Sequence, residues 1–166
     1  MVNQVVQEQL HGDLVWVRDI TLSNTMWGNR SLTLQHPRAG VHALGGGIGQ
    51  SLAMGIGSTV ATTVYPQNMP KTHINNAQAA IKIIVLCGDG GFMLNLGELA
   101  CAVQERANML IVLMNDGGYG VIKNIQNADY GSRHCYVDLH TPVVLEVDMK
   151  AWGPFAKKFA GPVRKH

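Results

Sequence analysis

Hydrophobic and polar positions along this chain alternate in blocks that predict strands separated by helices. Residues 13–19 (DLVWVRD) form a short apolar run between polar positions, which is typical of a strand. Residues 81–86 (IKIIVL) and 109–114 (MLIVLM) are almost entirely apolar, the pattern of strands covered on both faces of a parallel sheet. Residues 143–147 predict a last strand.

The intervals between these runs have helical or loop character. Residues 36–44 (HPRAGVHAL) make a poor strand, and residues 65–80, with two prolines and three asparagines, are expected to form a loop. The spacing of apolar and small residues predicts helices over 2–10, 48–63 and 92–106, and a turn or short helix over 120–126. Strands that alternate with helices imply an α/β domain with a mainly parallel sheet.

Composition narrows the class of protein. With 166 residues, 46% hydrophobic and only 14% charged, the chain is long and apolar enough for one domain with a core, which excludes a disordered protein. A net charge of +2 is too small to indicate nucleic-acid binding. There is no signal-peptide core, no run of about 20 apolar residues and no CxxC pair. We therefore expect a soluble cytoplasmic protein in which Cys87 and Cys101 are buried structural thiols.

Two glycine-rich loops, residues 88–91 and 115–118, follow the two most apolar strands, and each presents an aspartate, Asp89 or Asp116. Ligands of open parallel sheets bind beyond the carboxyl ends of the strands. Glycines there let backbone N–H groups approach an anion, and a helix that begins after the first loop favours phosphate. Two carboxylates beside a phosphate require a cation, and hard oxygen ligands favour Mg²⁺. The residues alone thus predict a metal-bridged diphosphate site.

At these loops the sequence resembles a known family. Residues 88–120 (GDGGFMLNLGELACAVQERANMLIVLMNDGGYG) are similar to the signature of thiamine-diphosphate-dependent enzymes, in which an Asn/Asp-rich turn follows a GDG turn by about 27 positions. The resemblance implies that Asp89, Asp116 and the backbone carbonyl of Gly118 bind Mg²⁺. It further implies that Gly88, Gly90 and Gly91 form the loop that binds the diphosphate and that the Tyr119 side chain lines the cofactor pocket. Many relatives have Asn at the position of Asp116 and Ser or Thr at that of Gly91.

The upstream segment 45–57 (GGGIGQSLAMGIG) resembles the family's GxMGxxLPxAIG stretch. The resemblance implies that the Gly46 carbonyl bonds the aminopyrimidine of the cofactor and that Ile48 wedges the two cofactor rings together. Such a wedge would bring the amino group close to the carbon that must lose a proton. Ala53 replaces the family's usual proline.

The resemblance is to the C-terminal domain of acetolactate synthase-like and 2-oxo acid decarboxylase-type enzymes, from about Gly12 onward. It implies a three-layer α/β fold with a mainly parallel central sheet, the cofactors thiamine diphosphate and Mg²⁺, a 2-oxo acid substrate, lyase or transferase chemistry, and a homodimer or homotetramer. The glutamate that activates the cofactor would lie on a pyrimidine-binding domain of the same or another chain. We therefore expect residues 1–166 to be one domain of a larger enzyme, inactive alone, with no catalytic residue of its own identified. Relatives have about thirty further residues, a helix and a strand, which would be missing here between 141 and 143.

Several alternatives remain open on the sequence. The chain could be the small subunit of a split, sulfopyruvate-type decarboxylase, or a non-catalytic phosphate-binding module. A dinucleotide-binding turn at 45–49 is disfavoured, because a poor strand precedes it and no carboxylate follows about 20 positions on. Among single residues, Asp116 could be a plain turn residue, and Ile48 and Tyr119 could serve packing alone. His36 and His42 could approach the site, whereas Glu98 is expected on a helix surface.

Overall fold

The core of the domain is a parallel β-sheet. The computed structural model describes residues 14–22, 32–34, 39–64 and 81–139. Its four strands are β1 (Leu14–Arg18), β2 (Gly40–His42), β3 (Lys82–Gly88) and β4 (Met109–Met114), in the order β2-β1-β3-β4. Every pairing of neighbouring strands is parallel, so the predicted mainly parallel sheet is confirmed.

Both faces of the two central strands are apolar, as expected for a parallel sheet. Val17 and Val85 point to one face, where they pack with Leu52 and Ile56. On the other face a second cluster is formed by Leu14, Trp16, Ile84 and Leu86. β4 departs from the expectation of a strand covered on both faces. It lies at one edge of the described sheet, and only Met109 among its residues is buried.

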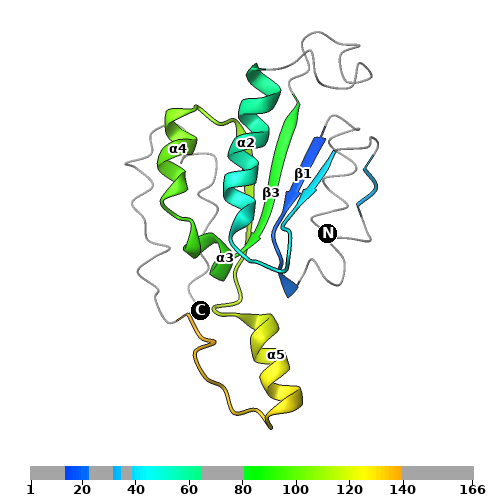
Figure 1. The fold of residues 1–166 in the computed structure, drawn as a ribbon, viewed down its shortest axis with the longest axis vertical. Coiled ribbons are helices and arrows are strands. Elements are labelled where there is room, and N and C mark those ends of the chain that lie inside the picture. Colours follow the sequence, from blue (N-terminus) through cyan, green and yellow to red (C-terminus); the bar gives the residue numbers. More distant parts are fainter. Residues whose placement is uncertain (1–13, 23–31, 35–38, 65–80, 140–166) are drawn as a thin grey trace.

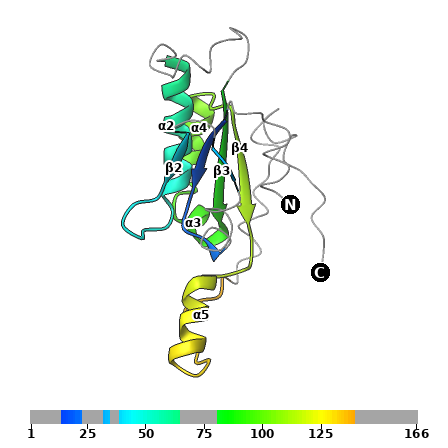
Figure 2. The same cartoon turned by 90° about the vertical axis from the view of Figure 1, so that its right-hand side faces the viewer.

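The described helices are α2 (Gln50–Val64), α3 (Asp89–Leu94), α4 (Glu98–Gln104) and α5 (Gly120–Asp129). Figures 1 and 2 show α2 and α4 on the same face of the sheet, with α3 and α5 at the end where the strands finish. α2 lies very close to β3, because Gly55 has no side chain at the point where a Cβ would overlap Val85. The small-residue helix predicted over 48–63 is therefore confirmed, beginning two residues later.

The single helix predicted over 92–106 is wrong in its boundaries. Helical structure begins already at Asp89 and is interrupted at residues 95–97, so that two short helices, α3 and α4, replace one long helix. Asn95 has a non-helical φ of −125°, and its side-chain amide donates a hydrogen bond to the Gly49 carbonyl. This contact with a distant loop holds the chain out of the helical path.

β2 is a strand that the sequence did not predict. It has three residues and pairs with β1 from Trp16 to Arg18. The Trp16 N–H donates to the Ala39 carbonyl at 2.7 Å, so the pairing extends just beyond the strand. The argument that a poor strand precedes the glycines at 45–49 therefore fails, although the absence of a following carboxylate still disfavours a dinucleotide turn.

Some expectations concern other parts of the chain or single thiols. The helix at 2–10, the loop at 65–80, the strand at 143–147 and the missing segment between 141 and 143 lie outside the described residues. Cys87 is buried as expected, but Cys101 is exposed, because α4 turns the neighbouring Ala102 toward the core instead. Within the described ranges, no helix combines the length and apolar character needed to cross a membrane.

Candidate functional site

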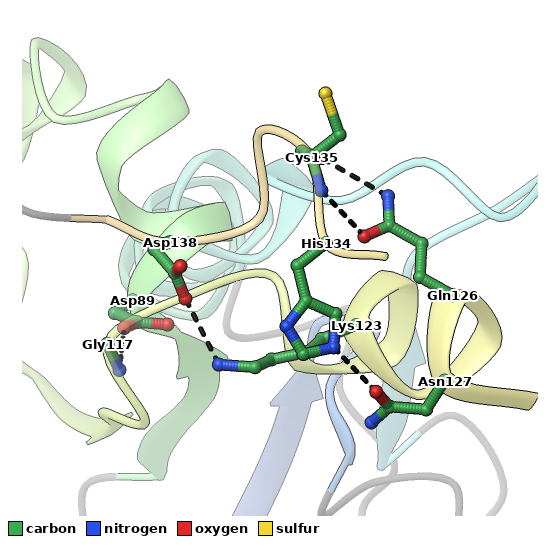
Figure 3. Close-up of polar contacts among 8 residues, drawn as sticks. All are labelled: Asp89, Gly117, Lys123, Gln126, Asn127, His134, Cys135 and Asp138. Atoms are coloured by element: carbon green, nitrogen blue, oxygen red, sulfur yellow. Dashed lines mark hydrogen bonds and ion pairs between the residues drawn. The ribbon is translucent and has the colours of Figure 1, made fainter. Parts of the chain in front are cut away.

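The first predicted loop begins where β3 ends. Gly88 is the last residue of β3, and Asp89 opens α3 with only 6% of its surface exposed. One oxygen of the Asp89 carboxylate accepts the N–H of Gly90 at 2.8 Å. The other accepts the N–H of Gly117 at 2.8 Å, a contact drawn in Figure 3. Asp89 therefore ties the two glycine-rich loops to each other.

The second loop places Asp116 beside Asp89, at the same end of the sheet. The pKa of Asp116 is raised, first by partial burial and then by the negative charge of Asp89, while hydrogen bonds from backbone N–H groups oppose the shift. Gly120 has no side chain where a Cβ would overlap the Asp116 carboxylate. The two carboxyl groups thus meet with negative charge that is only partly compensated, an environment that favours a bound cation.

A segment that the sequence did not single out supports the second loop. The Tyr119 N–H donates to the Val137 carbonyl at 2.7 Å, and the Leu139 N–H donates to the Gly117 carbonyl at 2.8 Å. These bonds flank Gly118, which forms an isolated antiparallel bridge with Asp138. Figure 3 shows Asp138 facing Lys123 of α5, with Nζ and Oδ1 3.1 Å apart. Residues 137–139 therefore fix the turn that contains Asp116.

Tyr119 packs directly on the first loop. A Cβ added to Gly90 would lie only 2.7 Å from a ring carbon of Tyr119, so the ring covers the Gly90 backbone. The structure therefore gives Tyr119 a packing role. It also places the ring at the loop that the sequence assigns to diphosphate.

The upstream glycine loop is open on its outer side. Gly45 and Gly46 have positive φ values of 65° and 76°, which favour glycine, and a Cβ on either would meet no described residue within 4 Å. The Gln50 side chain closes this loop from within, because its amide donates to the carbonyls of Leu44 and Gly47 at 2.9 Å. Ile48 is half-buried. The loop thus leaves free space next to Gly46, at the position that a side chain would occupy.

Asp19 is a residue of this region whose role the sequence did not reveal. It follows β1 and is only 2% exposed. Its Oδ2 accepts the N–H of Gly49 at 2.8 Å and the Ser51 hydroxyl at 3.0 Å, at the start of α2. The same oxygen would lie 2.9 Å from a Cβ at Gly91, so any side chain there would require Asp19 to move. Asp19 could have been found by the rule that identified Asp89, since both directly follow a parallel strand.

The remaining candidates lie away from these contacts or outside the described residues. His42 is an exposed residue of β2 whose Nδ1 lies 3.0 Å from the Ala43 carbonyl oxygen, and His36 is not among the described residues. Glu98 is half-buried in the first turn of α4, where its charge raises the pKa of the Cys101 thiol. No group of three or more His, Cys, Asp or Glu side chains gathers in the described part of the chain.

A parallel sheet with glycine-rich loops and two aspartates at its carboxyl edge defines an α/β domain of the class that binds ligands beyond the ends of its strands. The family model "Thiamine pyrophosphate enzyme, C-terminal TPP binding domain" matches residues 22–153, a range that includes all three loops. The chain belongs to this family.

Curated relatives agree with this assignment. The chain is 29% identical over 115 residues to a probable acetolactate synthase large subunit of Methanococcus aeolicus, covering 69% of this chain and 17% of the relative. It is 26% identical over 132 residues to the acetolactate synthase large subunit of Porphyra purpurea, covering 80% and 20%. The chain thus spans about a fifth of the length of these relatives.

Solved structures show the same fold. A benzoylformate decarboxylase from Polynucleobacter necessarius matches 92% of this chain and 26% of its own, with a TM-score of 0.72 and 20% identity. A thiamine diphosphate-dependent 4-hydroxybenzoylformate decarboxylase from Rhodococcus jostii matches 83% and 23%, with a TM-score of 0.64 and 20% identity. The predicted family and the predicted three-layer α/β, thiamine-diphosphate-binding fold are therefore confirmed.

Proposed function

We propose that this chain binds thiamine diphosphate through Mg²⁺ at the carboxyl ends of β3 and β4. The observation that supports this most directly is the meeting of Asp89 and Asp116 across the two loops, where each carboxylate would be a metal ligand. Within the described residues no third His, Cys, Asp or Glu side chain joins these two, so the Gly118 carbonyl and the diphosphate itself would complete the coordination. The N–H groups of Gly88 and Gly91 would bind diphosphate oxygens, whereas the Gly90 N–H, which the sequence also assigned to the diphosphate, is donated to Asp89.

The upstream glycine loop would hold the other end of the cofactor. Gly46, with open space above it, would accept a hydrogen bond from the aminopyrimidine, and Ile48 would press the rings into contact. When bound, thiamine diphosphate supplies a stabilised carbanion for reactions at the carbon next to a carbonyl. The residues of this chain would bind the cofactor, orient it and exclude water from its diphosphate end.

The parent enzyme would make or break C–C bonds of 2-oxo acids, as a lyase or transferase. This assignment is supported by the acetolactate synthase names of the relatives and by the decarboxylase names of the similar structures. The glutamate that activates the cofactor would come from a pyrimidine-binding domain of the same or another chain. α5 supports such a partner, because it has no buried residue and exposes Ile122 and Ile125 beside the second loop.

The test of this function is the binding of thiamine diphosphate to the chain by calorimetry, with Mg²⁺ in excess. Asp89→Ala should weaken binding by roughly 100-fold or more, because it removes a metal ligand and frees the Gly117 N–H. Asp129→Ala, at the exposed end of α5, is the matched control and should bind like the unaltered chain. Unchanged affinity in Asp89→Ala would refute the proposed metal site, and equally tight binding of unrelated phosphates would favour a general phosphate-binding module.

A further inference from the structure

We infer that Asp19 and Asn95 are positioning residues that grip the Gly49 peptide from two sides and so set the upstream glycine loop against the diphosphate loop. The inference rests on the proposed function, because it assigns these loops to the two ends of one cofactor. Neither residue is a proposed metal or diphosphate ligand. Asp19 Oδ2 does lie against Gly91 of the diphosphate loop, so the test uses Asp19→Asn, which keeps the size of the side chain.

The Asp19 side of the grip is a buried carboxylate. Its Oδ2 accepts hydrogen bonds from the N–H of Gly49 and from the backbone and hydroxyl of Ser51, while Oδ1 accepts the N–H of Ile20 at 2.8 Å. Hydrogen bonds to a buried charge are among the stronger ones in proteins. Asp19 thereby anchors the start of α2 to the end of β1.

The Asn95 side of the grip comes from the turn between α3 and α4. Its amide donates to the Gly49 carbonyl, so both polar groups of Gly49 are bonded to side chains from other elements. Gly49 has a positive φ of 90°, and a Cβ there would lie 3.1–3.2 Å from Asn95, Leu94 and the Gly91 carbonyl. Gly49 is therefore wedged against the segment that directly follows the diphosphate loop.

Different contacts therefore hold the diphosphate loop and position the upstream glycine loop. The diphosphate loop is held by the bonds of Asp89 to Gly90 and Gly117, in which Asp19 and Asn95 take no part. The upstream loop is closed internally by Gln50, but its position relative to the diphosphate loop depends on the grip on Gly49. Loosening the grip should therefore displace Gly46 and Ile48 while leaving the diphosphate contacts in place.

A pair of ligands distinguishes this role from a general loss of structure. Inorganic pyrophosphate would use only the diphosphate loop, whereas thiamine diphosphate would use both loops. In calorimetry with excess Mg²⁺, Asp19→Asn and Asn95→Ala should each weaken thiamine diphosphate binding roughly tenfold or more, because a charged or buried hydrogen bond is lost. Their affinity for pyrophosphate should change less than about twofold. Asp129→Asn and Asn124→Ala, both exposed on α5, are the matched controls.

Equal losses for both ligands, or no loss for either, would overturn the inference. A second measurement tests the grip without any ligand. Hydrogen exchange of a peptide covering residues 44–52 should accelerate in Asp19→Asn and Asn95→Ala relative to the controls, while a peptide covering 82–90 should not change. Unaltered exchange at 44–52 in the two variants would contradict the grip itself. If exchange accelerates as expected but the unaltered chain binds neither ligand, only the proposed function is contradicted.

Discussion

At the scale of single residues, the site is built on carboxylates at the ends of parallel strands. Asp89 and Asp116 could be predicted because each stands in a glycine-rich loop directly after an apolar strand, and such loops meet at one edge of the sheet. Asp19 also directly follows a parallel strand, yet no glycine accompanies it, and its partners, Gly49 and Ser51, are thirty or more positions away. Its burial depends on contacts between distant segments, which a local pattern does not contain.

The closeness of the two site carboxylates predicts how acid affects the metal-free chain. Because the pKa of Asp116 is raised above 3.8 in the folded state, this group favours the fold below its unfolded pKa and loses that contribution as the pH rises. Asp116→Asn should therefore stabilise the metal-free chain at pH 7, by only about 0.5 kcal/mol because solvent screens a carboxylate that is only partly buried. Urea unfolding at pH 7 and pH 4 measures this difference, which should shrink at the lower pH. A variant that is less stable at pH 7 would contradict the repulsion.

At the scale of secondary-structure elements, long apolar runs were predicted well and short or interrupted elements were not. β3 and β4 were found because a continuous apolar run marks a strand of a parallel sheet. β2 has three residues, too few to form a pattern. The break between α3 and α4 depends on the contact of Asn95 with Gly49, so the local helical spacing could not reveal it.

The close packing of α2 on β3 can be tested with two glycines of the same helix. Gly55→Ala would force a Cβ into Val85 and should destabilise the chain by about 1–3 kcal/mol. Gly57→Ala faces open space and should stabilise the chain by about 0.5–1 kcal/mol, since alanine favours helix. Urea unfolding of both variants measures the difference. Equal effects would mean that α2 does not lie as close to the sheet as described.

At the scale of the whole molecule, α5 stands apart from the core. None of its residues is buried, and it projects beyond the carboxyl edge of the sheet (Figure 1). Its exposed apolar residues, Ile122 and Ile125, are about half accessible, at 47% and 46%. Exposed apolar side chains on a helix without a core contact are expected where another domain or subunit packs.

A positive charge placed on this apolar surface should affect assembly but not folding. Ile125→Lys should leave the unfolding temperature within about 2 °C of the unaltered chain, because no core contact is lost. Sedimentation should show weaker association with a pyrimidine-binding domain or a second copy. Asn124→Lys adds the same charge at a neighbouring exposed polar position and is the control. Identical sedimentation of the two variants would contradict an apolar interface on α5.

The three cysteines also differ in what they can report. Desolvation by burial, with the charge of Asp19 adding to it, raises the pKa of Cys87 to about 12, so this thiol stays protonated and inaccessible. Cys101 and Cys135 are exposed. Cys101 lies on α4, whereas Cys135 lies in the segment after α5, where its backbone N–H and carbonyl bond to the Gln126 side chain of α5 (Figure 3). A maleimide dye would therefore attach at two known places without any engineering and without touching the sheet. The fluorescence intensity of a dye on Cys135 would change when another polypeptide packs against α5.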